Sequence, residues 1–265
     1  MNVLGIVGSP RRERGRSHQV VSAILAGARS AGASTEMLYL IDEEPEYCID
    51  CGHDCFGEGD CAQEAGATLR SQRVDAADAL VLCAPVYCWQ PNGLTATLLD
   101  KVRLSSRPWN RGTANGRPAL GIAVAGGTGT GVFSALQPIY AWLCLWKFQP
   151  LDPLPVTRFN MDQVLAEAEG LGVELVGRGT QPFPSTAEML LTYDRLPYMS
   201  YGRVDEFCWL AEQALAGLRV RETAGDAAEE VSRLLEQAKA CEAEDDASGA
   251  AEAVVQAYQV ARAAW

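Results

Sequence analysis

The sequence predicts an α/β protein with a doubly wound, five-stranded parallel sheet and a helical C-terminal extension. Short apolar runs alternate with segments whose apolar residues recur at helical spacing, which is typical of a parallel sheet. The runs at 79–84 and 119–125 are continuously apolar, as expected of central strands covered on both faces. After about residue 180 this alternation stops and helical patterns follow one another.

Five strands are expected in the first 179 residues, at 3–7, 36–41, 79–84, 119–125 and 150–156. The helices expected between and after them begin at Ser17 and cover 68–77, 94–102, the segment ending at Trp146, and 161–176. Trp142 and Trp146 lie on an apolar helix pattern, so we expect both indoles in the core. Cys83 lies inside an apolar strand and is expected to be an inert core residue.

Residues 180–265 are predicted to form the extension, separate from a sheet domain at 1–179. Its helices are expected at 204–218, 227–240 and 250–263, with Ser248-Gly249 separating the last two. The last two carry apolar stripes that need burial, either on the sheet or against another subunit. We therefore expect the extension to take part in a homo-oligomer.

Composition excludes several classes of function. The chain has 265 residues and a formal net charge of −12, which disfavours nucleic-acid binding because phosphate neutralisation requires an excess of Lys and Arg. No stretch is long and apolar enough to span a membrane, and the start resembles no signal peptide. We therefore expect a cytoplasmic protein, in which nine cysteines indicate metal or redox chemistry more than disulfides.

The loop after the first strand has the chemistry of a phosphate site. It reads Gly8-Ser9-Pro10-Arg11-Arg12-Glu13-Arg14-Gly15-Arg16-Ser17 and leads into a helix. Backbone N–H groups at a helix N-terminus bind phosphate, and hydroxyl and guanidinium groups add donors. The alternative is a solvated basic turn with Ser17 as a simple N-cap. The loop matches neither the Walker A pattern nor G-x-G-x-x-G.

Two further loops follow predicted central strands. The first, residues 84–93, contains Tyr87, Cys88 and Trp89, whose surroundings suit a flat heteroaromatic ring. The second, Gly126-Gly127-Thr128-Gly129-Thr130-Gly131, allows close backbone approach to a ligand. Ligands of open α/β sheets bind at the carboxyl ends of the strands, so the three loops are expected to form one site.

Four cysteines follow the second predicted strand with the spacing C-x2-C-x3-C-x5-C. They are Cys48, Cys51, Cys55 and Cys61. Compact sets of four thiolates hold iron–sulfur clusters or zinc. A [4Fe–4S] cluster, a four-cysteine zinc site and free thiols all remain open, and His53 is expected to be an exposed loop residue.

Together, these motifs resemble the NADPH-dependent FMN reductase superfamily, which has a flavodoxin-like fold. The resemblance rests on G-S-P-R…G-x-S, the cysteine run, A-P-V-Y and G-G-x-G-x-G, which occur in this order within residues 1–178. The cysteines make the chain most similar to the iron–sulfur flavoproteins of that group. The sequence departs from the pattern at the third cysteine, which comes one residue late, at Ala96, where many relatives have lysine, and in its long extension.

The resemblance implies FMN, and it implies which residues bind it. The phosphate would contact Ser9, Arg11, Ser17, His18 and Gln19. The ring would lie against Pro85, Val86, Tyr87, Cys88 and Trp89, with Gly126, Gly127 and Thr128 on its other side. The metal ligands would be Cys48, Cys51, Cys55 and Cys61, and the protein would be a homodimer or homotetramer.

The sequence thus predicts a flavin-dependent oxidoreductase that moves electrons between a reduced donor, FMN and a [4Fe–4S] cluster or small acceptor. The donor would be NAD(P)H or a ferredoxin-type protein, and no side chain is expected to act as acid or base. One alternative is a reductase of FMN or quinones without a cluster. The other is a non-catalytic, zinc-stabilised binding protein on the same scaffold.

Overall fold

A computed structural model describes residues 1–103, 116–220 and 225–265, and it confirms the flavodoxin-like α/β fold. Its parallel strands occupy five positions in the described residues, in the order β2-β1-β3-β5-β6. Their bounds are β1 Asn2–Val7, β2 Ser34–Tyr39, β3 Ala79–Tyr87, β5 Pro118–Val124 and β6 Gln149–Pro150. Two short strands complete the sheet: β7 (Leu154–Val156) pairs with β5, and β4 (Gln90–Pro91) pairs antiparallel with β3.

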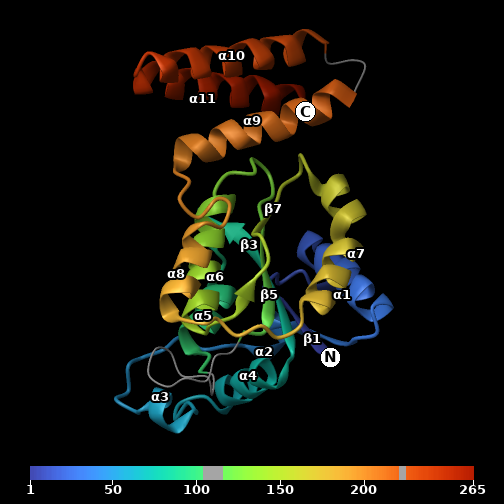
Figure 1. Ribbon diagram of the computed structural model, residues 1–265, viewed down its shortest axis with the longest axis vertical. Helices are drawn as coiled ribbons and strands as arrows, with labels where there is room; N and C mark the ends of the chain where they lie inside the picture. The colour runs from blue at the N-terminus through green and yellow to red at the C-terminus, as the bar shows by residue number, and fades with distance from the viewer. Residues whose placement is uncertain (104–115, 221–224) are drawn as a thin grey trace.

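Helices cover both faces of this sheet (Figure 1). The helices on one face are α1 (Arg16–Ser30) and α7 (Met161–Arg178). The helices on the other are α4 (Ala65–Ala76), α5 (Gly93–Lys101), α6 (Val132–Leu145) and α8 (Thr186–Asp194). Short helical turns lie in the connections, at η1 (Arg12–Arg14), α2 (Leu40–Glu43) and α3 (Cys55–Glu58).

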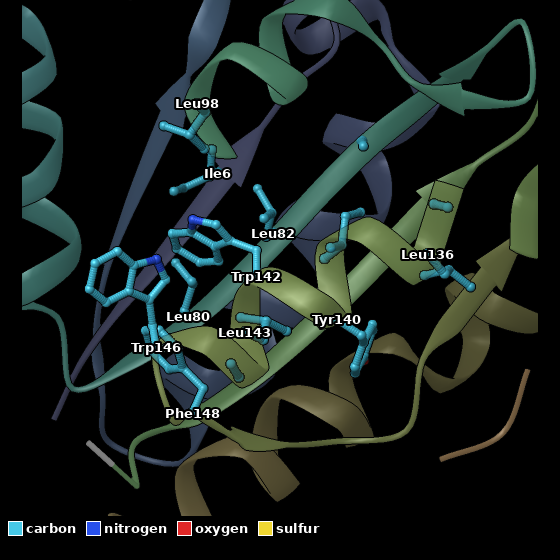
Figure 2. Packing of buried hydrophobic residues seen from close by; sticks show 14 of the residues in the cluster. Ile6, Leu80, Leu82, Leu98, Leu136, Tyr140, Trp142, Leu143, Trp146 and Phe148 are labelled. Carbon is cyan, nitrogen blue, oxygen red and sulfur yellow. The ribbon is translucent and has the colours of Figure 1, made fainter. Parts of the chain in front are cut away.

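The core explains why these segments form these elements. On the α6 face, strand residues such as Leu80 and Leu82 pack against the aromatic residues of α6 and its C-terminal turn (Figure 2). Trp142 and Trp146 are buried there, as expected, and Cys83 is buried on the opposite face, where desolvation raises its pKa to about 12. Cys83 is fully buried, which confirms that it is a core residue, and a buried thiol with a raised pKa is unreactive.

On the α1 face, two glycines let helices approach closely. A Cβ built on Gly27 would lie 1.9 Å from the backbone oxygen of Glu169, and one built on Gly172 would lie 2.0 Å from that of Ile24. Any larger residue would force α1 and α7 apart, so these two glycines fix the spacing of the helices.

The structure corrects several predicted boundaries. The last strand is interrupted at residues 151–153, between β6 and β7, where Pro153 lacks the N–H group that a ladder needs. Helix α8 was not predicted as a separate element. Its residues Met189 and Tyr193 join the core of the sheet.

The extension beyond α8 contains α9 (Arg203–Val220), α10 (Gly225–Ala243) and α11 (Ala247–Ala264). Ser248-Gly249 lies in the first turn of α11, not between helices, because the Asp246 side chain caps this helix by accepting from the N–H of Gly249. The apolar stripes of α10 and α11 are buried against α9 within the same chain. The stripes therefore do not need a second subunit to cover them.

Helix α8 shares the core of the sheet, whereas α9, α10 and α11 form a core of their own. The division into domains at residues 179 and 180 remains a prediction. None of the helices in the described residues has both the length and the hydropathy needed to cross a membrane.

Candidate functional site

The first predicted loop wraps around an uncapped helix N-terminus. Gly15 is the N-cap of α1, no side chain caps the helix, and its first turn contains no acidic residue. Ser9 and Ser17 are buried at this end, and Arg11 is exposed beside them. Free N–H groups, the positive end of the helix dipole and nearby arginine make a site that fits a phosphate group.

His18 is oriented by a residue that the sequence analysis missed. The His18 Nδ1 atom lies 2.7 Å from the hydroxyl oxygen of Tyr39, at the carboxyl end of β2. Burial raises the pKa of Tyr39, and the nearby charge of Glu13 adds to this rise. Tyr39 therefore stays a neutral phenol that fixes the ring of His18 at the phosphate loop.

The second predicted loop is a tight hairpin. β3 continues to Tyr87 and pairs with β4 through Val86 and Pro91, which leaves Cys88 and Trp89 as the two turn residues. Both have positive φ, 50° and 65°, at positions where Gly and Asn are favoured. Backbone strain of this kind costs roughly 1–3 kcal/mol per residue and gathers at functional sites.

Asn92 joins the first loop to the second, although no sequence pattern identified it. Its side chain is buried, its Nδ2 donates to the backbone oxygen of Gly8 at 2.8 Å, and its Oδ1 accepts from Thr95 at 2.7 Å. Gly8 fits there because an added Cβ would lie 2.1 Å from the Thr95 hydroxyl oxygen. The phosphate loop and the ring loop are therefore held together.

The glycine-rich loop borders the same region. Gly126, Gly127 and Thr128 are exposed, and a Cβ on either glycine would meet no atom within 4 Å. By contrast, a Cβ on Gly131 would lie 2.5 Å from the Cα of Trp89, so the far end of this loop packs on the hairpin. The glycine-rich loop thus touches the hairpin at Gly131, and its exposed Gly126 and Gly127 leave room for a ligand.

A cavity of about 960 Å³ lies behind the hairpin. The hairpin, α5, α6 and one residue of α9 line it. The lining residues are Cys88, Trp89, Gln90, Pro91, Ala96, Leu99, Asp100, Ser134, Gln137, Pro138 and Arg203. Its volume is that of a small-molecule site. No sequence pattern placed residues of α6 or α9 in this cavity.

The extension contacts the glycine-rich loop directly. The buried carboxylate of Glu206 on α9 accepts hydrogen bonds from the N–H groups of Gly131 and Phe133. The Tyr258 hydroxyl on α11 donates to the backbone oxygen of Thr128 at 2.7 Å. These contacts span 75 and 130 residues in sequence, so no local pattern could have predicted them.

The structure brings all four predicted cysteines to one place. Cys48, Cys51, Cys55 and Cys61 line a single cavity of about 210 Å³, together with Asp50, Gly52, His53, Gln63, Lys101 and Arg103. Burial raises the pKa of Cys55, Arg103 opposes this, and the neighbouring Cys61 and Cys51 add to the rise. Among the described residues, no three Cys, His, Asp or Glu side chains are close enough to hold one metal ion.

His53 is half-buried rather than an exposed loop residue. Its Nε2 lies 2.6 Å from a carboxylate oxygen of Asp60, and this contact raises the pKa of the imidazole. The imidazole therefore supports the loop between the second and fourth cysteines.

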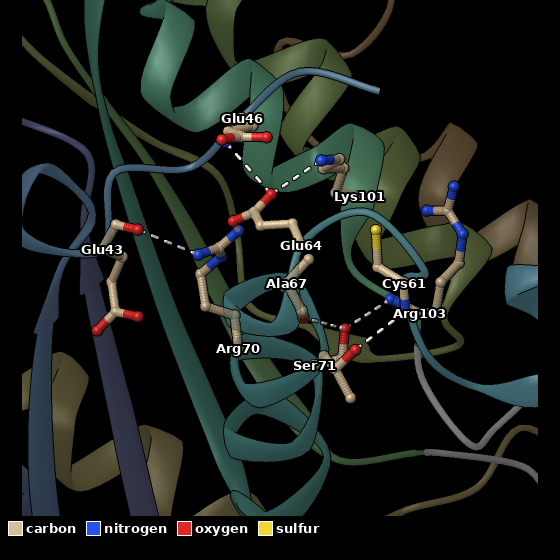
Figure 3. A network of polar contacts seen from close by, with 10 residues as sticks. Glu43, Glu46, Cys61, Glu64, Ala67, Arg70, Ser71, Lys101 and Arg103 are labelled. Atoms are coloured by element: carbon tan, nitrogen blue, oxygen red, sulfur yellow. Dashed lines mark hydrogen bonds and ion pairs between the residues drawn. The ribbon is translucent and has the colours of Figure 1, made fainter. Parts of the chain in front are cut away.

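An ionic network lies close to Cys61 (Figure 3), and its Lys101 also lines the cysteine cavity. Glu64 contacts Arg70 and also Lys101, whose Nζ lies 2.8 Å from Oε2 of Glu64. Desolvation opposes ionisation of Glu64, but hydrogen bonds from Lys101 and Arg70 outweigh it and lower the pKa of Glu64. The network ties the segment after Cys61 to the end of α5.

The cysteine cavity and the ring hairpin lie at opposite ends of α5. Asn92 precedes the first residue of this helix, whereas its last residue, Lys101, lines the cysteine cavity. Nine residues make a helix about 13 Å long. The position of the cysteines after β2 suggests that they reach the ligand edge, but residues 44–54, which form no helix or strand, lead the chain away from that edge (Figure 1).

An open helix N-terminus, a hairpin and a glycine loop at the carboxyl edge of a five-position parallel sheet define a flavodoxin-like site for a mononucleotide. The chain matches the model of the NADPH-dependent FMN reductase family over residues 1–150. It therefore belongs to this family of flavin-dependent reductases, whose cofactor is FMN. The extension lies outside the matched region.

Two relatives are described as iron–sulfur flavoproteins. The one from Archaeoglobus fulgidus is 28% identical over 130 residues, which cover 49% of this chain and 56% of that protein. The one from Methanosarcina thermophila is 27% identical over 143 residues, which cover 54% of this chain and 73% of that protein. The match thus spans little more than half the length of the first relative.

Solved structures share the fold at low identity. The azoreductase AzrA superposes with a TM-score of 0.53 and 15% identity, covering 67% of this chain and all (100%) of that one. A putative quinone reductase from Klebsiella pneumoniae gives 0.50 and 18%, covering 69% and 87%. These similarities confirm the flavodoxin-like architecture of the sheet.

Proposed function

We propose that this protein is an FMN-dependent oxidoreductase of the iron–sulfur flavoprotein type. It would move electrons between a reduced donor, FMN and a [4Fe–4S] cluster or small acceptor. The observation that carries the proposal is that four thiols line one cavity in a chain that also has an open α1 N-terminus. The two archaeal relatives named above support the cluster.

The residues around α1 and the hairpin fit FMN. The phosphate would bind to the N–H groups of α1 with Ser9, Arg11, Ser17, His18 and Gln19 around it. The ring would lie between the hairpin residues Pro85, Val86, Tyr87, Cys88 and Trp89 and the loop residues Gly126, Gly127 and Thr128. When bound, FMN supplies hydride and electron transfer and a cluster supplies one-electron transfer, while the protein provides position and electrostatics.

The lining of the cysteine cavity suits a cluster. All four thiols share it, as a cluster ligated by four thiolates requires. A four-cysteine zinc site would use the same thiols, so metal analysis distinguishes the two. Lys101 and Arg103 in the lining would offset the negative charge of four thiolates.

The cavity behind the hairpin would admit a small electron donor or acceptor. It adjoins the predicted ring-binding residues Cys88 and Trp89 and carries the cation of Arg203 at its edge. NAD(P)H or another small molecule would exchange electrons inside this cavity, whereas a ferredoxin-type protein would have to dock at its mouth.

We also propose a homo-oligomer, a homodimer or homotetramer. Because α5 separates the cysteine cavity from the hairpin of its own chain, the cluster would exchange electrons with FMN of a neighbouring copy. Leu190, Leu191, Tyr201 and Val204 are exposed apolar side chains available for such a contact. Light scattering measures the mass, and a strictly monomeric protein would exclude this arrangement.

The decisive experiment is an anaerobic purification followed by absorption spectroscopy, flavin identification, and iron and sulfide analysis. We expect FMN together with iron and sulfide. Cys51→Ala should remove the cluster absorbance and leave FMN bound, because the two sites are separate. Cys241→Ala on α10 provides a matched control that should change neither. Release of FAD, or zinc in place of iron, would contradict the proposal.

A second candidate function is a reductase of FMN or quinones without a cluster. The family description itself favours it, because NADPH-dependent FMN reduction needs no cysteine cavity. Full NAD(P)H-dependent activity in protein without metal would establish this candidate in place of the first. Zinc without bound flavin would instead indicate the non-catalytic binding protein.

A further inference from the structure

Helix α6 begins at the carboxyl edge of the sheet without a local cap. Its N-cap is Gly131, which has no side chain to accept from the first N–H groups of the helix. Buried N–H groups without acceptors are costly, and the helix dipole makes this end attractive to an anion. The chain must therefore supply an acceptor from elsewhere.

Glu206 supplies that acceptor from the extension. Its carboxylate is 1% exposed and accepts from Gly131 N–H through one oxygen and from Phe133 N–H through the other, the latter at 2.9 Å. The extension thus provides a cap that α6 lacks in its own sequence. This contact fixes the end of the loop that runs from Gly126 to Gly131.

A second contact holds the middle of the same loop. The Tyr258 hydroxyl donates to the Thr128 backbone oxygen, and Leu210 packs so closely that a Cβ on Gly129 would lie 3.0 Å from it. Three loop glycines, Gly127, Gly129 and Gly131, have positive φ. Because glycine adopts positive and negative φ about equally readily, these residues do not by themselves hold the loop in this conformation. Its conformation depends on the residues packed against it.

The extension also contacts the ring hairpin. The rings of Phe207 and Trp89 have centroids 6.2 Å apart, and the Arg203 guanidinium carbon lies 5.8 Å from the centroid of Trp89. One helix, α9, therefore reaches both ring-binding segments.

We propose that Glu206 and Tyr258 are positioning residues that hold the 126–131 loop in its cofactor-binding shape. In addition, Glu206 closes the N-terminus of α6 to other anions, which leaves α1 as the phosphate site. The consequence for the cofactor rests on the proposed FMN function, whereas the effect on the loop does not. The extension would thus complete the flavin site from outside the part of the chain that matches the family.

Hydrogen–deuterium exchange on the full-length apoprotein tests the clamp without cofactor. Glu206→Ala and Tyr258→Phe should each raise exchange at residues 126–133 by about ten-fold, because one stabilising contact is lost. Glu212→Gln, an exposed change on α9, and Tyr193→Phe, which removes a buried hydroxyl elsewhere, serve as controls. Unchanged exchange in both test variants would overturn the proposal.

Chemical rescue tests the role of the carboxylate. Formate should restore protection of the loop in Glu206→Ala by occupying the vacated space, whereas chloride at equal ionic strength should not. Glu206→Gln keeps the space filled, so formate should have no effect on it. Equal effects of formate and chloride would contradict a specific carboxylate site. If the Glu206→Ala variant does not fold, hydrogen–deuterium exchange of Tyr258→Phe alone tests whether the extension holds the loop.

Binding of FMN then tests the link to the cofactor. We expect the dissociation constant for FMN to rise about ten-fold in Glu206→Ala and to recover with formate. A wild-type protein that binds no FMN, but whose loop responds to the variants, would refute the proposed function and leave the clamp intact. Variants with mobile loops and unchanged FMN affinity would refute the link to the cofactor.

Discussion

The N-termini of α1 and α6 begin at the same edge of the sheet, yet the chain treats them in opposite ways. α1 has no cap, no acidic residue in its first turn, and an arginine-rich loop before it. The first N–H groups of α6 donate to the buried carboxylate of Glu206, which lies 75 residues away in sequence from Gly131. Both helices present the same backbone groups and the same dipole. The difference supports the proposal that α1 binds the phosphate, because Glu206 already fills the N-terminus of α6 with an anion of the protein itself.

Adding an acid to α1 would make it resemble α6 and should have the largest effect. Ser17→Asp places a carboxylate in the first turn, where it stabilises the helix but repels a phosphate. Because juxtaposed like charges cost several kcal/mol, FMN affinity should fall roughly a thousand-fold. Fluorescence titration with FMN measures this, and circular dichroism checks that the variant is folded.

Ser30→Asp, at the other end of α1, is the matched control for that experiment. It adds the same charge where the helix dipole is negative, so FMN affinity should stay unchanged. If both variants weaken FMN equally, net charge rather than the α1 N-terminus controls binding.

The half-buried Glu64 sharpens the comparison, because its carboxylate contacts the buried cations Arg70 and Lys101, whereas that of Glu206 accepts from N–H groups. Glu64→Gln leaves Lys101 and Arg70 buried without a counter-charge, which should lower the free energy of unfolding by about 3–5 kcal/mol. Denaturant unfolding measures this. Glu174→Gln removes only an exposed pair on α7, so it should change stability by less than about 1 kcal/mol. Equal effects would mean that burial of the pair contributes nothing.

Removing one positive charge beside the α1 N-terminus should have a smaller effect on FMN affinity than adding a negative one. Arg11→Ala should weaken FMN by about 1.5–3 kcal/mol if the guanidinium makes a charge-assisted bond to phosphate. Arg29→Ala, at the far end of α1, removes only the hydrogen bond to Thr35 and should leave FMN affinity unchanged. Isothermal titration of both variants separates a phosphate contact from a general loss of positive charge.

Of the two helix ends, only that of α1 could be predicted from the sequence. The α1 site is encoded locally, since its strand, turn, arginines and helix are consecutive in sequence. The four cysteines can likewise be identified by their spacing. The α6 cap is not local: neither Glu206 nor Tyr258 is marked by its neighbours in sequence, and each acts through tertiary contact. Asn92 was missed for the same reason, because its partner is the oxygen of Gly8. The apolar periodicity located most elements, whereas α8 and the split last strand depend on packing and on prolines.

The smallest expected effect is a difference in pH dependence between the carboxylates of Glu64 and Glu206. The pKa of Glu64 is lowered, so its contribution to stability is present above the ordinary value of 4.5 and is lost as pH falls through the lowered value. The pKa of Glu206 is raised, mainly by burial, with the N–H groups of Gly131 and Phe133 opposing the rise. The unfolded chain therefore ionises first, and stability declines as pH rises from about 4.5 through the raised value.

Glu64→Gln should flatten the acid limb of a plot of unfolding free energy against pH, whereas Glu206→Gln should flatten the decline above pH 4.5. If both variants flatten the same limb, the two carboxylates share one electrostatic environment and the contrast between cation pairing and helix capping does not hold.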